Sequence, residues 1–114
     1  MESNMEIRAA TLADLPAILQ IEQACPAAAH WSESQYGKAV AGPGRLVLVA
    51  ETGGRVAGFL VASTATQEWE LENIAVGPAA RRQGIGRALI GRMLAEAKNR
   101  GVSTKWTIKC IDQV

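Results

Sequence analysis

Hydrophobic and polar positions along the chain predict a series of five strands and three helices. Runs of alternating or continuous apolar residues predict strands at residues 5–10, 45–51, 55–63, 68–76 and 103–111. Apolar residues at helical spacing predict helices over residues 12–24, from Ser32 to Gly42 and over 82–100. The order β-α-α-β-β-β-α-β predicts an α/β or α+β fold, with helices packed on the faces of a sheet.

Capping and turn residues mark where several of these elements begin and end. Thr11 followed by Asp14 predicts a capping box at the start of the first helix. The apolar face of that helix is interrupted by one polar residue, Glu22. The segment 52–54, Thr-Gly-Gly, predicts the turn of a β-hairpin, and Gly101 is typical of the residue that follows a helix.

Length and composition indicate one ordinary globular domain over residues 1–114. The chain is 48% hydrophobic and 20% charged, with a formal net charge of +1. This balance excludes a disordered tail, a collagen-like repeat and a basic protein that coats DNA. No apolar run approaches the roughly 20 residues of a membrane helix, and the first residues lack the basic-then-apolar order of a signal peptide. We therefore expect a soluble, cytoplasmic protein with no membrane partner.

Cysteine and histidine are too few for a metal centre or a convincing thiol nucleophile. The chain has two cysteines, Cys25 and Cys110, and one histidine, His30. Without a CxxC pair or a histidine cluster, we expect no metal. A Cys–His nucleophile pair would have to use His30, which no obvious residue orients. Buried thiols without a chemical role are the favoured interpretation.

The segment from Arg81 to Arg87, Arg-Arg-Gln-Gly-Ile-Gly-Arg, is the one that predicts chemistry. It follows the strand at 68–76 and lies at the start of a helix, where the first N–H groups have no partner within the helix. The helix dipole adds partial positive charge there. Gly84 and Gly86 lack the Cβ atoms that would keep a diphosphate from the backbone. The segment therefore predicts an anion site, with three arginines supplying formal charge.

Two familiar phosphate-binding motifs fail on this segment. A P-loop ends in Gly-Lys-Ser or Gly-Lys-Thr, which is absent after these glycines. A dinucleotide-binding fingerprint needs a third glycine, and Leu89 stands at that position.

The spacing Arg81-x-x-Gly84-x-Gly86, directly after the strand that ends at Val76, resembles the Arg/Gln-x-x-Gly-x-Gly/Ala motif of the GCN5-related N-acetyltransferase (GNAT) superfamily. Residues 7–16, 21–23 and 31–33 are similar to RimI-like members, which acetylate the N-terminal amine of a ribosomal protein. The resemblance covers about residues 5–104. It implies a mixed, mostly antiparallel sheet, with acetyl-CoA as co-substrate and no metal. The implied reaction transfers an acetyl group to a protein N-terminal or small-molecule amine by direct attack.

The resemblance also implies which residues hold acetyl-CoA. The pantetheine arm is expected to pair with the edge of the strand at 74–76, and the diphosphate to bind the loop amides at about 82–87. The expected acetyl-CoA residues are Ile74, Ala75, Val76, Arg81, Arg82, Gln83, Gly84, Ile85, Gly86 and Arg87.

Acidic and aromatic residues are the candidates for the acceptor side. Glu68, Glu70 and Glu72 share one face of a strand, and Glu70 lies where many members of the superfamily carry a general base. The alternatives are a solvated acidic face, or a face including Glu72 that attracts a cationic amine. Trp31 and Tyr36 lie in the region that commonly contacts the acceptor, and packing on each other across the helix start is the alternative.

The similarity stops after Thr104, which predicts a C-terminally truncated version of the domain. Ile108 stands where RimI-like proteins carry a glutamate, and their later asparagine and tyrosine have no counterpart. The second functional hypothesis is therefore a degenerate member that binds CoA or a partner without turnover. An exposed sheet edge would favour a homodimer. A nucleic-acid partner is disfavoured by the net charge and the acidic strand.

Overall fold

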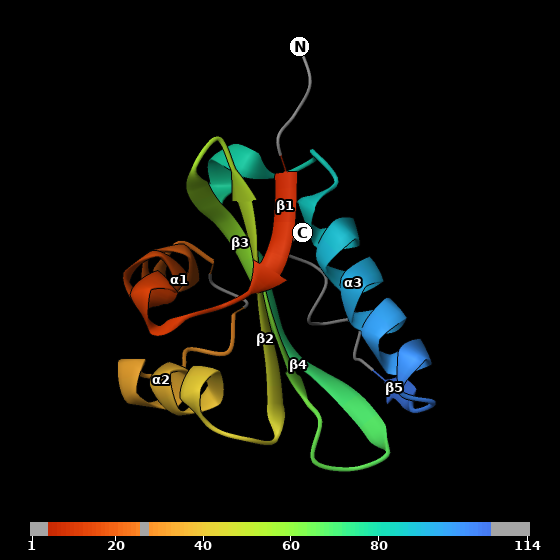
Figure 1. The fold of residues 1–114 in the computed structure, drawn as a ribbon. Helices are drawn as coiled ribbons and strands as arrows, with labels where there is room; N and C mark the ends of the chain where they lie inside the picture. The colour runs from red at the N-terminus through yellow and green to blue at the C-terminus, as the bar shows by residue number, and fades with distance from the viewer. Residues whose placement is uncertain (1–4, 26–27, 106–114) are drawn as a thin grey trace.

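The chain folds around one sheet with helices on both of its faces (Figure 1). The computed structural model describes residues 5–25 and 28–105. Its elements are β1 (Met5–Ala9), η1 (Leu12–Asp14), α1 (Leu15–Gln23), α2 (Glu33–Ala41), β2 (Arg45–Thr52), β3 (Arg55–Ser63), β4 (Glu68–Val76), η2 (Pro78–Ala80), α3 (Ile85–Asn99) and β5 (Ser103–Lys105). The predicted order of strands and helices is confirmed, with two short 3₁₀ turns added.

The sheet is mixed and mostly antiparallel, as expected. Within the described residues its five strands lie in the order β1-β2-β3-β4-β5, and the first three pairings are antiparallel. The last pairing is parallel and joins Glu68–Glu70 to Ser103–Lys105. Figure 1 shows α1 and α2 on one face and α3 on the other. The helices therefore cover the sheet from both sides, which gives two apolar layers.

Each layer is a separate hydrophobic cluster. On the α3 face, Leu89 and Met93 pack against strand residues that include Leu60. On the α1 and α2 face, Ile18 and Tyr36 pack against residues that include Phe59. All six of these side chains are 0% exposed. Burial of this extent stabilises a domain by about 1.5–3 kcal/mol for each large apolar side chain.

Two helix boundaries differ from the prediction. The predicted helix at 12–24 is divided, because η1 precedes an α-helix in whose first turn Pro16 lies, where a missing N–H is tolerated. The predicted helix at 82–100 begins only at Ile85. Arg82 and Gly84 have φ angles of 65° and 81°, and this left-handed conformation cannot continue a right-handed helix. The residues before Ile85 therefore form a loop.

The hairpin and the final strand also differ slightly from the prediction. Thr52 pairs with Arg55, so the turn itself is only Gly53-Gly54. Both glycines have positive φ, as a two-residue hairpin turn of this kind requires. The predicted strand at 103–111 is confirmed as far as Lys105, and its remainder lies outside the described residues.

A charged cluster holds the first turn of the chain to the sheet. Arg8 donates to both carboxylate oxygens of Asp14 at 2.9 and 3.0 Å, and to Glu51 at 2.9 Å. Asp14 also forms the predicted capping box with Thr11. The hydrogen bonds from Arg8 hold the pKa of Asp14 below its usual value, although burial acts in the opposite direction.

The Asp14 carboxylate makes stability depend on pH in the acid range. Because its folded pKa is lowered, its contribution is present above the usual pKa of 3.8 and is lost as the pH falls through the folded value. Asp14→Asn should lower the free energy of unfolding by about 2 kcal/mol at pH 7. Urea denaturation at pH 7 and near pH 3 should show the difference between the two proteins shrinking. A constant difference would contradict this role.

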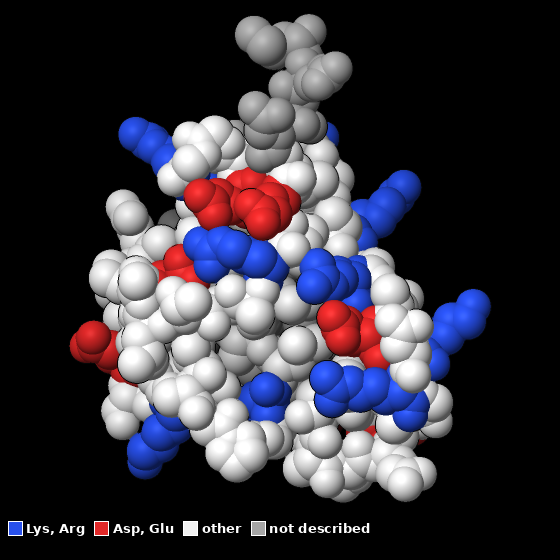
Figure 2. Space-filling model, viewed as in Figure 1, with Lys and Arg blue, Asp and Glu red and all other residues white. Residues whose placement is uncertain are grey.

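Charges on the face drawn in Figure 2 are mixed in sign. Acidic and basic side chains lie next to one another over β1 and α3. Arg92 of α3 donates to Glu96 at 3.2 Å and to the backbone carbonyl of Ile7 in β1 at 2.9 Å. This face therefore has no continuous basic patch. In the described part of the chain, no helix is long and apolar enough to cross a membrane.

Candidate functional site

The loop between η2 and α3 has the geometry of an anion site. Gly84 occupies the position before the first helical residue, in the left-handed conformation, and Ile85 follows in the helix. A left-handed residue followed by a helical one turns successive N–H groups toward one side. A Cβ atom built on Gly84 would meet nothing within 4 Å, so the space in front of the loop is open. The loop residues therefore fit a diphosphate, which needs that space and those amides.

The side chains of the loop point in different directions. Arg82, Gln83 and Arg87 are exposed, so their charges and amide can reach a bound anion. Ile85 and Gly86 are buried, which leaves only their backbone groups for a ligand. Arg82 is a non-glycine residue with positive φ, a conformation that costs about 1–2 kcal/mol. Strain of this kind is found preferentially at functional sites.

Arg81 differs from Arg82 and Arg87, because its guanidinium points into the protein. The prediction that all three arginines present their charge to a ligand is therefore wrong for Arg81. Its Nε donates to the carbonyl of Val76 at 3.1 Å, and its Nη2 donates to Sγ of Cys25 at 3.2 Å. The side chain is half-buried. The guanidinium points inward because Cys25, two residues after α1, and Val76, at the end of β4, lie together and both accept from it. Arg81 therefore joins three segments of the fold.

Cys25 is a buried thiol, as the interpretation of the sequence favoured. It is 0% exposed, and its Sγ contacts the Val76 carbonyl at 3.5 Å as well as Arg81. Cys110 lies outside the described residues, and His30 is exposed. Among the described residues, no group of three His, Cys, Asp or Glu side chains could hold a metal ion.

The end of β4 that leads into the loop is buried on both faces. Ile74, Ala75 and Val76 are at most 1% exposed. The register between β3 and β4 shifts near this end, because Val61 pairs with Asn73 whereas the next residue, Ala62, pairs with Leu71. In the described residues, β5 pairs with β4 only at Glu68–Glu70. Pairing of a pantetheine arm with 74–76 stays a prediction. The arm would have to use other backbone groups than the Val76 carbonyl, because that carbonyl already accepts from Arg81.

The acidic row of β4 is neutralised at two of its three positions. Glu68 pairs with Lys105 at 3.7 Å. Glu72 pairs with Arg45, whose Nε and Nη2 lie 2.7 and 3.3 Å from its two carboxylate oxygens. Glu70 is exposed and makes no ion pair with any described residue. Of the three carboxylates, Glu70 is therefore the one available to a cationic ligand.

Strand register places Glu70 on the face that α1 and α2 cover. Arg45 pairs with Ser63, and Ser63 pairs with Glu70 across β2, β3 and β4. Side chains of directly paired residues share one face of a sheet. Because Arg45 also bonds Glu72, these charged groups lie together beside the α2 side of the molecule.

Trp31 lies against the same charged group. The guanidinium carbon of Arg45 is 5.4 Å from the centre of the Trp31 ring, a cation–π contact. The ring is half-buried and lies 5.4 Å from the ring of Tyr36, which confirms the expected packing across the start of α2. We refer to Trp31, Arg45 and Glu72 as the Trp31 cluster. It is the partly exposed surface next to Glu70.

Tyr36 lies beneath this surface. It is 0% exposed, and its hydroxyl donates to Glu22 and accepts from Nδ2 of Asn73 at 2.7 Å. Burial raises the pKa of the Tyr36 hydroxyl, and the hydrogen bond to Glu22 raises it further. This burial supports the alternative interpretation of Tyr36, in which its ring packs in the core. Direct contact of Tyr36 with an acceptor stays a prediction.

Three polar residues of this region were not among the sequence candidates: Glu22, Arg45 and Asn73. Glu22 could have been found, because it interrupts the apolar face of its helix. Asn73 directly precedes the apolar run Ile74–Val76, which is a weaker indication. Arg45 gives no local indication, since its importance depends on which strands pair.

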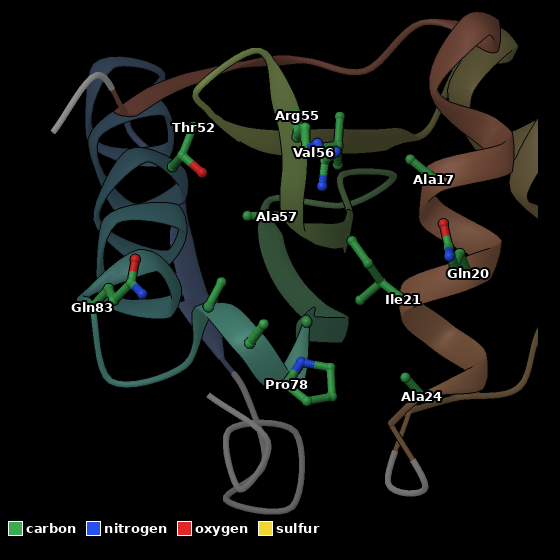
Figure 3. Close-up of a pocket in the computed structure, with 13 residues that line it drawn as sticks. Ala17, Gln20, Ile21, Ala24, Thr52, Arg55, Val56, Ala57, Pro78 and Gln83 are labelled. Atoms are coloured by element: carbon green, nitrogen blue, oxygen red, sulfur yellow. The ribbon is translucent and has the colours of Figure 1, made fainter.

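A groove of about 430 Å³ lies beside the loop. Figure 3 shows α1 on one side of it, with the β2–β3 hairpin and Pro78 across from α1, and Gln83 at the loop end. The lining residues are Ala17, Gln20, Ile21, Ala24, Thr52, Arg55, Val56, Ala57, Gly77, Pro78, Ala79, Ala80 and Gln83. Only Gln83 among the predicted acetyl-CoA residues lines the groove.

Comparison with known proteins places this sheet, with an anion loop between its fourth strand and the following helix, in a class of acyl-group transferases. The model of the acetyltransferase (GNAT) family matches residues 13–113. The chain therefore belongs to the GNAT family.

Relatives with assigned names agree with membership of this family. The chain is 39% identical over 93 residues to the ribosomal protein bS18-alanine N-acetyltransferase of Escherichia coli K12, covering 82% of this chain and 62% of that protein. The Salmonella typhimurium enzyme of the same name is 39% identical over 94 residues, with the same coverage. The chain thus spans less than two thirds of the length of these relatives.

Solved structures show the same fold. The ribosomal-protein-S18-alanine N-acetyltransferase of Escherichia coli matches with a TM-score of 0.76 and 35% identity, over 86% of this chain and 62% of that one. The PaiA N-acetyltransferase of Thermoplasma acidophilum, in complex with coenzyme A, matches with a TM-score of 0.73 and 18% identity, over 87% and 75%. The second likeness concerns the fold alone.

Proposed function

We propose that this protein is an acetyl-CoA-dependent N-acetyltransferase that acts on a protein N-terminal amine or a small-molecule amine. The observation that carries the proposal is the loop at 81–87, an open anion site at the start of α3 in a chain of the GNAT family. Acetyl-CoA, when bound, supplies the activated acetyl group. The transfer is direct and forms no covalent acyl-enzyme, which is consistent with the inaccessible Cys25 thiol.

On the cofactor side, residues of the chain bind acetyl-CoA and orient it. The N–H groups at the start of α3 donate hydrogen bonds to the diphosphate, since they have no partner within the helix. Arg82 and Arg87 add positive charge from exposed positions. Arg81 holds the loop against the end of β4 and against Cys25, and thereby keeps the amides directed outward.

On the acceptor side, Glu70 is proposed to attract the ammonium group and then to take its proton. A free α-amino group has a pKa near 8, so it is mostly protonated at neutral pH and must lose a proton before it can attack. Glu70 is exposed beside the Trp31 cluster, while its neighbours Glu68 and Glu72 are ion-paired. Glu72, through Arg45, contributes to the surface that faces the acceptor.

Calorimetric titration of the purified 114-residue chain with acetyl-CoA tests this proposal. Saturable binding, followed by turnover with a peptide whose N-terminal amine is free, is the expected result. Desacetyl-CoA should bind the same site, because the diphosphate is common to both ligands. Binding without turnover on any amine would instead favour the alternative, a family member that binds CoA or a partner without catalysis. A folded sample that does not bind would overturn the proposal.

Three further expectations belong to the same proposal. The cytoplasm supplies acetyl-CoA and newly made protein N-termini, so a cytoplasmic location suits the reaction. We expect the protein to bind acetyl-CoA and an amine acceptor, and to bind neither nucleic acid nor a membrane. A homodimer through a sheet edge is checked by light scattering at several protein concentrations, where a mass near 24 kDa, twice the 12.1 kDa of one chain, would support it.

A further inference from the structure

The segment between α1 and α2 is held at alternate residues by buried side chains. The N–H of Ala29 donates to Oδ1 of Asn73 in β4 at 3.2 Å. The N–H of Trp31 donates to Oε2 of Glu22 in α1 at 2.8 Å. His30, between them, has a φ of 60°, a conformation rarely adopted by residues other than glycine. Such a conformation persists where the surrounding structure enforces it, and here two hydrogen bonds flank it.

The two acceptors of these hydrogen bonds are joined by one hydroxyl group. The Tyr36 hydroxyl donates to the same Oε2 atom of Glu22 and accepts from Nδ2 of Asn73. The three side chains are 0%, 4% and 3% exposed for Tyr36, Glu22 and Asn73. In the described residues, no buried side-chain nitrogen or oxygen lacks a partner. Removing the hydroxyl would leave Oε2 of Glu22 with only the Trp31 N–H as a donor, and would take from Nδ2 of Asn73 its buried acceptor, which is costly.

The segment held in this way carries Trp31 to the proposed acceptor surface. Trp31 contacts Arg45, and Arg45 is bonded to Glu72, two residues from Glu70. A change in the backbone at 29–31 would move the indole ring relative to that ion pair. It would leave the loop at 81–87 in place, because Arg81 joins that loop to Val76 at the end of β4 and to Cys25, and neither bond involves Tyr36.

We propose that Tyr36, together with Glu22 and Asn73, positions the segment 28–32 so that Trp31 determines the affinity for the acceptor amine. Tyr36 is a positioning residue in this scheme and acts on the acceptor through Trp31. The inference rests on the proposed acetyltransferase function for its effect on the acceptor. The effect on the segment itself does not depend on any activity.

Tyr36→Phe tests the inference, because it keeps the ring that packs between Trp31 and Phe59 and removes only the hydroxyl. Amide hydrogen exchange should accelerate about tenfold at Ala29 and Trp31, since their acceptors lose a fixing partner. The amides of the central strands β2 and β3 should exchange as in the wild type. Unchanged exchange at both loop amides would overturn the positioning role.

Steady-state kinetics separates positioning from a general loss of structure. For Tyr36→Phe, the KM for the acceptor peptide should rise about fivefold to tenfold, while the KM for acetyl-CoA stays within about twofold. Trp31→Ala is the complementary variant: it should raise the acceptor KM similarly, but without faster exchange at Ala29. A fall in kcat alone, or equal changes in both KM values, would overturn the inference.

The two proposals can fail separately. If the wild-type chain acetylates no amine, the proposed function fails, and the acceptor role of Trp31 fails with it. The exchange experiment then still decides whether Tyr36 holds the segment 28–32. If the wild type is active but Tyr36→Phe leaves the acceptor KM unchanged, only the inference about Tyr36 is wrong.

Discussion

Replacing Gly84 by valine is expected to abolish acetyl-CoA binding while the protein stays folded. A Cβ atom at this position meets no protein atom within 4 Å, so the new side chain would occupy the space of the ligand and not of the core. Hydrogen bonds to a charged group contribute about 1.5–3 kcal/mol each, so losing two of them should weaken binding at least about 100-fold. Calorimetric titration with acetyl-CoA measures the loss.

Gly44→Val is the matched control for this variant. Gly44 has a φ of 86°, close to the 81° of Gly84, and its added Cβ also meets nothing within 4 Å. Both variants therefore carry similar backbone strain, about 1–2 kcal/mol, but only Gly84 lies in the loop. Gly44→Val should bind acetyl-CoA like the wild type. Normal binding by Gly84→Val would show that the diphosphate lies elsewhere, and loss in both variants would assign the effect to strain.

Replacing Glu70 by glutamine is expected to slow acetyl transfer by about 10²–10⁴-fold, the usual contribution of a general base. Binding of acetyl-CoA should not change, because Glu70 lies at the start of β4 and the diphosphate loop follows its end. The deficit should shrink above about pH 8, where the amine of the acceptor is increasingly neutral without help. Turnover measured from pH 6 to 10, with a calorimetric Kd for acetyl-CoA, checks both parts.

Glu68→Gln is the control for the acidic row. It removes a carboxylate two residues earlier on the same strand, one that already pairs with Lys105. If Glu70 acts as a base, this change should leave the rate within about twofold. Equal losses in the two variants would mean that the row works by attracting the cationic amine. An unaffected Glu70→Gln would assign the base to a water molecule or to another residue.

Features that depend on a few consecutive residues were predictable. The Gly53-Gly54 turn, the Thr11–Asp14 capping box and the order of strands and helices each follow from backbone conformations that neighbouring residues impose. The anion loop belongs to the same group, because the glycine at position 84 and the helix start after it are adjacent. The start of that helix was placed too early, since nothing local shows that Arg82 adopts a left-handed conformation.

Features that depend on distant partners were not predictable. The charge of Arg81 suggested a phosphate ligand, but Cys25, 56 residues away, and the end of β4 draw its guanidinium inward. The availability of Glu70 could not be read from three equivalent glutamates. It follows from the ion pairs of Glu72 and Glu68 with residues on other strands, which strand register brings alongside.

The sequence by itself determined the class of this protein: a GNAT domain with an anion loop before its long helix and an acidic strand leading toward it. Only the tertiary structure decided which of those residues face a ligand and which hold the site together. Tyr36, joined to Glu22 and Asn73 across separations of 14 and 37 residues, is an example of the second kind. The physical reason is that local patterns report backbone preference, whereas hydrogen-bond partners of buried side chains are set by packing and register, which no short segment contains.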